Sequence, residues 1–221
     1  MSNEEQAVLE FFAQEENLPL ALSVAELVDG IRQRMNTAFW RALHNDIAKL
    51  IEAHSLPWAV AITEDRNTPD SVVGLHLQPL SDQALFLRLM MEQQYMGENL
   101  RIYYGVMWNT APTPDKTQLA QVKSLQEVLQ SEGLKNNESF LAWNWTPYHP
   151  RRRDFLQRYT DDAVALLDEV GELLRHLLLK HGTALDAANA ALRDTPRSVT
   201  VSLDQLRASI TKTGISSSKP S

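Results

Sequence analysis

The chain of 221 residues contains no cysteine and no long apolar run. Without cysteine there can be no disulfide framework, no thiolate metal site and no cysteine nucleophile. The longest apolar runs, such as Leu177 to Leu179, are far too short to cross a bilayer, and the expected first helix follows no basic-then-apolar leader. These absences predict a cytoplasmic protein that has no contact with a membrane.

The signature motifs of several enzyme classes are also missing. The sequence has no GxxxxGK[ST] or GxGxxG phosphate-binding loop and no GxSxG nucleophile motif. His176 and His181 lie five residues apart on an expected helix, whereas two metal ligands on one helix face need a spacing of three or four. We therefore expect no metal site, no cofactor and no catalytic residue. We interpret both histidines as cations near a helix C-terminus, where the helix dipole favours them.

Charge is spread unevenly along the chain. Residues 1–148 carry ten basic and nineteen acidic side chains, a net charge of −9, whereas residues 149–221 carry eleven and nine, a net charge of +2. An acidic body argues against strong nonspecific binding of DNA, because that affinity comes largely from neutralising phosphates. A local basic site near the middle of the chain stays compatible with this balance.

The region from Trp58 to Trp108 predicts four consecutive strands. The segments WAVAITE, SVVGLHLQP, ALFLRLMM and LRIYYGVMW alternate in side-chain type and are separated by short, turn-rich connections. Short connections favour antiparallel pairing. Both faces of the inner strands are substantially apolar, so we expect helices to cover one face and the other face to be partly buried.

Helices are expected on both sides of these strands. Early segments are 4–17, a helix from Ser23 with a Ser23/Glu26 capping box, and 37–54. Later segments are an amphipathic helix over 116–131 and a long helix from Thr160, as its cap, to His181 before Gly182. The sequence thus predicts an α+β fold: a four- or five-stranded, mostly antiparallel sheet flanked by N-terminal and C-terminal helices.

This pattern also predicts how the chain is organised. Residues 1–55 form a helical segment that packs on the sheet, and residues 56–182 form the core of sheet and helices. Residues 183–210 are expected to form a short helix and a connection. The Ser/Thr/Lys-rich residues 211–221 are expected to form a flexible tail.

A basic segment next to aromatic residues is the strongest local candidate for a binding site. Arg151, Arg152 and Arg153 follow closely on Trp145 and Tyr148. Guanidinium groups bind phosphate and aromatic rings stack on bases, so this segment could contact nucleic acid or an acidic partner. In the alternative interpretation, the tryptophans are core anchors at a loop-to-helix junction and the arginines form a solvated turn.

Two Pro-Asp pairs resemble the first half of a PD-(D/E)xK nuclease motif. That chemistry needs a second acid to hold Mg²⁺ and a lysine two residues beyond it to assist the attacking water. After Pro69-Asp70 the next acid, Glu92, is followed by glutamines, and nothing suitable follows Pro114-Asp115. We interpret both pairs as turns, and a degenerate metal-dependent nuclease around Asp70 and Glu92 is the weakest alternative.

The order of aromatic features is more distinctive. A helix with Phe39-Trp40 precedes a Trp-led strand, Trp58-Ala59-Val60; then come Tyr103-Tyr104-Gly105-Val106, an amphipathic helix, Phe140-Leu141-Ala142-Trp143 and a long helix. This order resembles the region that follows the catalytic core in one bacterial branch of the PD-(D/E)xK nuclease superfamily, a group often linked to phage defence. The nuclease core itself has no counterpart here, so no catalytic residue is carried over. The resemblance implies a stand-alone accessory domain beside a separate catalytic subunit.

Our leading functional hypothesis is therefore a non-catalytic accessory or interaction subunit of a cytoplasmic nuclease-type or anti-phage defence assembly. The expected docking surfaces are the acidic N-terminal helices and the helix from Thr160 to His181, with Leu173 and Leu177 as docking residues. The partner would be a larger catalytic subunit, or a second copy of the chain. A nucleic-acid-binding module centred on Trp145 and the three arginines is the alternative from another class.

Overall fold

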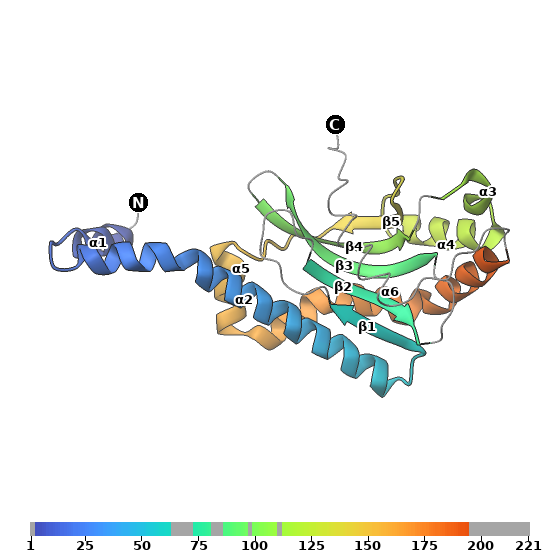
Figure 1. Ribbon diagram of the computed structural model, residues 1–221, viewed down its shortest axis with the longest axis horizontal. Helices are drawn as coiled ribbons and strands as arrows, with labels where there is room; N and C mark the ends of the chain where they lie inside the picture. Colours follow the sequence, from blue (N-terminus) through green and yellow to red (C-terminus); the bar gives the residue numbers. More distant parts are fainter. Residues whose placement is uncertain (1–2, 63–72, 81–85, 97–98, 110–111, 195–221) are drawn as a thin grey trace.

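The computed structural model describes residues 3–62, 73–80, 86–96, 99–109 and 112–194, and it confirms the α+β fold (Figure 1). Five strands form one antiparallel sheet in which each strand pairs with the next along the chain. They are β1 (Trp58–Ile62), β2 (Val73–Pro79), β3 (Leu87–Met96), β4 (Asn99–Trp108) and β5 (Phe140–Trp145).

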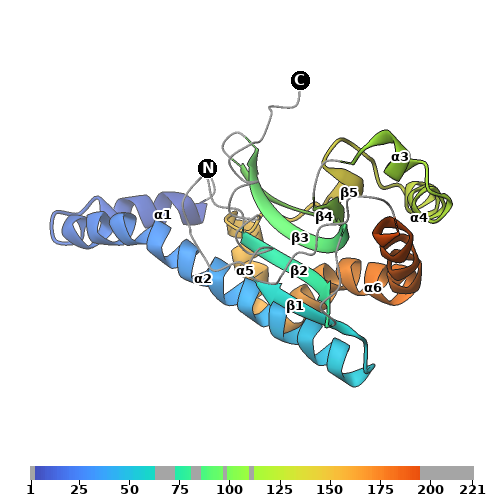
Figure 2. The same cartoon turned by 45° about the vertical axis from the view of Figure 1, so that its right-hand side comes forward.

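Helices precede and follow the sheet. Their bounds are α1 (Asn3–Phe12), α2 (Leu18–Ala53), α3 (Pro114–Thr117), α4 (Ala120–Ser131), α5 (Arg153–Asp161) and α6 (Ala163–Arg193). Figures 1 and 2 show that α2 and α6 lie on the same side of the sheet. The main core fills the space between them and the strands, as the alternation of side chains predicts. Leu87, Leu89 and Met91 of β3 point into this core, together with Phe39 and Leu43 of α2.

The long helices differ from the expected ones at their boundaries. Ser23 is not a cap, because it lies inside α2 and its hydroxyl donates a hydrogen bond to the carbonyl of Pro19. Thr160 belongs to α5, and the cap of α6 is Asp162, whose carboxylate accepts a hydrogen bond of 3.0 Å from the Ala165 amide.

Helix α6 also continues well past Gly182. Leu185, Ala188 and Leu192 extend its apolar stripe and are all buried, so packing carries the helix through the glycine. The separate short helix expected from residue 183 is therefore wrong, and residues 183–193 belong to α6. His176 and His181 consequently lie mid-helix, away from the C-terminal dipole that we expected to favour them.

Only the second half of α2 packs on the sheet. Trp40, Leu43, Ile47 and Ile51 recur every three or four residues and are buried together with Phe39, whereas α1 buries no residue. Helix α1 and the first half of α2 project from the body (Figure 1). We call residues 3–34 the arm. We expected residues 1–55 to pack on the sheet, and among the described residues of this segment only the second half of α2 does so.

Among the described residues, no helix is both long and apolar enough to cross a membrane. The expected tail, 211–221, lies outside the described residues, as do Asp70 and residues 195–210.

Candidate functional site

The arm exposes an apolar surface that the rest of the described chain lacks. Of the thirteen large hydrophobic side chains that are exposed among the described residues, nine lie on the arm. Four of them, Leu20, Val24, Leu27 and Ile31, follow a spacing of four, three and four and are each 45–63% exposed. This is the spacing of a coiled-coil seam, so one face of α2 presents a continuous apolar stripe.

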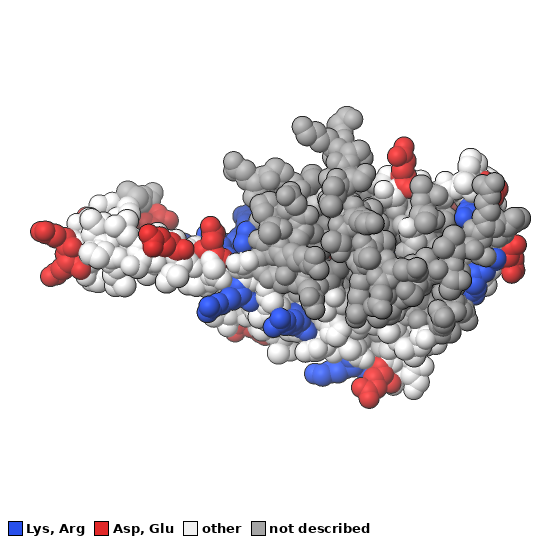
Figure 3. All heavy atoms as spheres, in the orientation of Figure 1, with Lys and Arg blue, Asp and Glu red and all other residues white. Residues whose placement is uncertain are grey.

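Small residues flank the stripe and leave room for a neighbour. Ser23 and Gly30 occupy positions beside it, and a Cβ atom added at Gly30 would meet nothing within 4 Å. Such positions let a second helix approach closely. The arm is also acidic: residues 3–34 contain seven acidic and two basic side chains. Figure 3 shows acidic groups along the arm and basic groups where it meets the body.

A second feature is a buried polar cluster on the sheet face opposite α2 and α6. The side chains of His76, Arg88, Glu92 and Tyr103 point to this face, and each residue is 7% exposed or less. His76 Nε2 lies 2.7 Å from Glu92 Oε1, and the Tyr103 hydroxyl donates a hydrogen bond to the other carboxylate oxygen. Three strands supply these four residues, because the antiparallel register brings β2, β3 and β4 side by side.

Burial governs the ionisation of this cluster. Desolvation lowers the pKa of His76 and of Arg88 and raises that of Tyr103. Burial also opposes ionisation of Glu92, but its interactions with His76, Tyr103 and Arg88 outweigh that cost and lower its pKa. Glu92 is thus engaged in an internal network, which does not favour the degenerate nuclease site proposed for it and Asp70.

Arg88 is the unusual member of the cluster. Its Nη2 reaches the Met107 sulfur at 3.4 Å, while Nε and Nη1 are buried without a hydrogen-bond partner among the described residues. An unpaired edge of a guanidinium group matches a carboxylate or a phosphate. Sequence reasoning missed this cluster apart from Glu92. The signal that could have found it is the set of polar residues in otherwise apolar strands.

A third feature lies where α4 ends against α6. Helix α4 ends in a Schellman motif: Leu134 N donates to Leu129 O at 3.2 Å, Gly133 N donates to Gln130 O at 2.9 Å, and Gly133 has φ +90°. This motif places Glu132 at the C-cap with its carboxylate facing α6. There it lies 2.7 Å from Lys180 Nζ and 3.1 Å from the Nε2 atoms of both His176 and His181.

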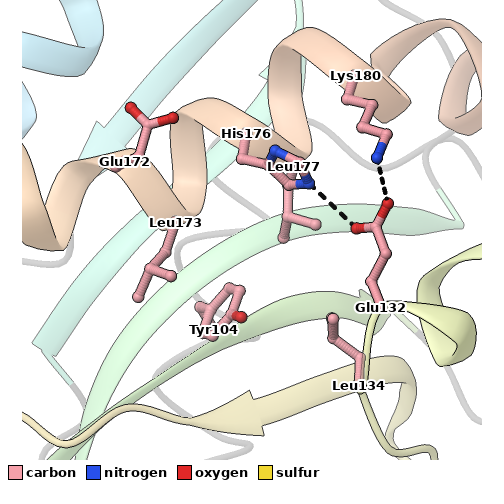
Figure 4. Close-up of a pocket in the computed structure, with 8 residues that line it drawn as sticks. All are labelled: Tyr104, Glu132, Leu134, Glu172, Leu173, His176, Leu177 and Lys180. Carbon is pink, nitrogen blue, oxygen red and sulfur yellow. Dashed lines mark hydrogen bonds and ion pairs between the residues drawn. The ribbon is translucent and has the colours of Figure 1, made fainter.

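We expected that a spacing of five residues would keep His176 and His181 from facing one group, and this geometric expectation is wrong. Their rings lie 5.8 Å apart and converge on a carboxylate from another helix, which the spacing rule for a single helix does not consider. Hydrogen bonding to Lys180, with smaller contributions from the two histidines, lowers the pKa of Glu132 to about 2. A pocket of about 330 Å³ adjoins this group (Figure 4). Its polar side includes Glu132, His176 and Lys180, and its apolar side is formed by Tyr104, Leu134, Leu173 and Leu177.

The two expected docking residues of α6 contribute to this pocket rather than to an exposed surface. Leu177 is 1% exposed and belongs to the main core, and Leu173 is half-buried against it. Burial of Leu177 does not fit the docking role that we expected for it. The arm, by contrast, presents the exposed apolar face that docking requires.

The expected basic aromatic edge is divided between two sides of the sheet. Trp145 packs with Tyr103 on the face opposite the helices, under Arg101, whose guanidinium carbon lies 5.4 Å from the ring centre. Tyr148 is buried in the main core, and its hydroxyl donates a hydrogen bond of 2.7 Å to Glu169.

The three arginines do not complete a stacking surface. Arg151 is half-buried, and Arg152 is exposed and pairs with Asp154 at 3.3 Å. Arg153 is exposed at the start of α5. Tyr148 is a core residue, whereas Trp145 is only partly buried, so the two aromatic side chains of this segment do not form one surface with the arginines.

Comparison with known protein families, with characterised proteins and with solved structures gives no match.

Proposed function

We propose that this chain is a non-catalytic interaction subunit that docks one helix of a partner protein along the arm. The observation that carries the proposal is the exposed stripe of Leu20, Val24, Leu27 and Ile31. Contiguous apolar surface of this kind is typical of an interaction site, since leaving it in water forgoes the stabilisation that burial brings. A helix that lies in the stripe would bury its own apolar face at the same time.

The charge of the arm indicates whether the helix that docks on it belongs to a second copy of the chain or to a different protein. Two arms pairing with each other would bring together two segments with a net charge of −5 each. Like charges of this size oppose association, whereas a basic amphipathic helix would be attracted. The proposed occupant is therefore a helix of another protein, with an apolar face flanked by lysine or arginine.

The wider setting is also a proposal. The order of aromatic features resembles an accessory region of a nuclease superfamily, and the chain would serve a cytoplasmic nuclease-type or phage-defence assembly beside a separate catalytic subunit. Two observations support this setting: the resemblance in the order of aromatic features, and an arm whose exposed apolar stripe suits docking. The expected nucleic-acid edge gains no support, because Trp145 and Tyr148 lie on opposite sides of the sheet.

The test is a double substitution on the arm, Leu20→Gln with Leu27→Gln. The matched control is Val164→Gln with Leu179→Gln, which changes two exposed residues of α6 that are 71% and 49% exposed. A partner would be captured on the tagged wild-type chain from its native host and then purified. Its affinity for each variant would be measured by calorimetry at several salt concentrations.

The proposal expects a partner with a basic apolar helix, whose affinity falls with salt and is lost in the arm variant but kept in the control. Light scattering on the purified chain gives the opposing outcome. A dimer that the arm variant dissociates would show that the occupant is a second copy and would overturn the proposal. A partner that binds the arm variant and the control equally would overturn it as well.

A further inference from the structure

We propose that Glu132, His176 and His181 form a binding site for a divalent transition-metal ion such as Zn²⁺. One carboxylate oxygen and the two imidazole Nε2 atoms all lie within 4.8 Å of one another. Two imidazoles and one carboxylate suit zinc and its neighbours, whereas Mg²⁺ and Ca²⁺ require oxygen ligands. The inference is independent of the docking role proposed for the arm.

The spacing of the donor atoms fits such an ion. A tetrahedral zinc ion with bonds of about 2.0–2.1 Å holds its ligand atoms roughly 3.3 Å apart. Each imidazole Nε2 already lies 3.1 Å from a Glu132 oxygen. An ion could therefore enter between these groups after small side-chain shifts, without movement of the helices that carry them.

The position of Glu132 gives a second reason to expect a cation. A carboxylate at the C-terminus of a helix faces the negative end of the helix dipole, which is unfavourable. Glu132 occupies this position at the end of α4, held by the Schellman motif, and two histidines and one lysine of α6 converge on it. Figure 4 shows His176 and Lys180 beside its carboxylate. The site thus gathers negative charge from the carboxylate and the helix end, opposite two imidazole groups of the kind that bind metals.

Lys180 is the competing cation. Its ammonium group contacts Glu132 Oε1 at 2.7 Å but is 56% exposed, so it can turn into solvent. The second oxygen of Glu132 faces both imidazoles. An ion bound by the three ligands would displace the lysine, and the lysine should therefore weaken metal binding in the wild-type chain.

An ion held here would adjoin the pocket of Figure 4, because Glu132 and His176 both line it. Three protein ligands leave one tetrahedral position for water or a small ligand. The remaining wall is largely apolar, formed by Leu134, Leu173 and Leu177. A small molecule with one metal-binding group and an apolar body suits this shape.

The experiment is calorimetric titration of the untagged full chain with Zn²⁺, with Mg²⁺ as the comparison ion. We expect one equivalent of Zn²⁺ to bind and Mg²⁺ not to bind. His176→Ala, at a side chain 45% exposed, should weaken Zn²⁺ binding at least about tenfold without unfolding the chain. His54→Ala, at an exposed histidine of the α2 C-cap, is the control and should change nothing.

Lys180→Met separates a metal site from an internal ion-pair network. If the three groups are metal ligands, removing the competing ammonium should tighten Zn²⁺ binding severalfold. Unchanged Zn²⁺ binding in His176→Ala, or weaker binding in Lys180→Met, would overturn the proposal. Failure of the wild-type chain to bind Zn²⁺ at micromolar concentration would also overturn it, and none of these results bears on the arm.

Discussion

Replacing Asn189 with alanine should destabilise the fold by about 3 kcal/mol. Asn189 is 2% exposed on α6 and holds the start of β3. Its Oδ1 accepts hydrogen bonds of 2.9 Å from the amides of Phe86 and Leu87, and its Nδ2 donates to the Leu87 carbonyl at 2.9 Å. One side chain therefore makes three hydrogen bonds to the backbone of a buried strand.

The magnitude follows from these three bonds. Each buried hydrogen bond contributes about 1–1.5 kcal/mol to stability, and a buried group left unpaired costs about as much or more. Their loss would cost roughly 3–4.5 kcal/mol, while alanine would gain about 0.5 kcal/mol as a better helix former. The expected net loss is about 3 kcal/mol.

Asn137 provides a matched control. Its Oδ1 also accepts two backbone hydrogen bonds of 2.9 Å, from the amides of Ser139 and Phe140, but this asparagine is exposed. Water can replace its side chain after substitution, so Asn137→Ala should cost at most about 1 kcal/mol.

Equilibrium unfolding in urea, followed by circular dichroism, measures both variants against the wild type. An unchanged m-value would show that the comparison concerns stability rather than the extent of unfolding. If Asn189→Ala loses no more stability than Asn137→Ala, the reasoning from buried backbone hydrogen bonds is refuted.

Two further predictions concern glycine positions and pH. Gly105→Ala should destabilise the fold by about 3 kcal/mol or more, because the new Cβ would lie 2.1 Å from the Ala142 carbonyl oxygen. Gly30→Ala meets no neighbour and should stabilise α2 by up to about 1 kcal/mol. Urea unfolding measures both variants, and equal changes in the free energy of unfolding would contradict this prediction. The lowered pKa of Glu132, about 2 against 4.5, means that its contribution is complete above pH 4.5 and is lost towards pH 2. Glu132→Gln should therefore reduce the fall in melting temperature over this range, and an unchanged slope would contradict the assignment.

The sheet could be predicted because its information is local. Alternating side chains and short connections mark β2, β3 and β4, and the mixed apolar character of both faces correctly indicated burial on both sides. Helix boundaries were harder to predict. Thr160 is a local start signal and Gly182 a local stop signal, and packing overrides both. The stripe that continues to Leu192 is visible in the sequence, but its burial against the core depends on the tertiary fold.

The polar clusters could not be predicted, because each one is assembled from distant parts of the chain. Glu132 meets His181 across 49 residues, through a helix end on one side and the middle of α6 on the other. His76 meets Glu92 only because β2 and β3 pair in one register, and a shift of one residue would turn either side chain to the opposite face. Local spacing rules do not contain this information.

Helix α2 connects the arm to the rest of the molecule in a defined way. It runs unbroken from Leu18 to Ala53, so the exposed stripe and the buried residues around Leu43 belong to one continuous helix. Helix α6 packs closely on it there, since a Cβ at Gly171 would lie 3.1 Å from a Leu43 methyl group. The same α6 carries His176 and His181. A partner held on the arm would therefore be connected to the Glu132 pocket through two packed helices, and its size would decide whether it also contacts that pocket.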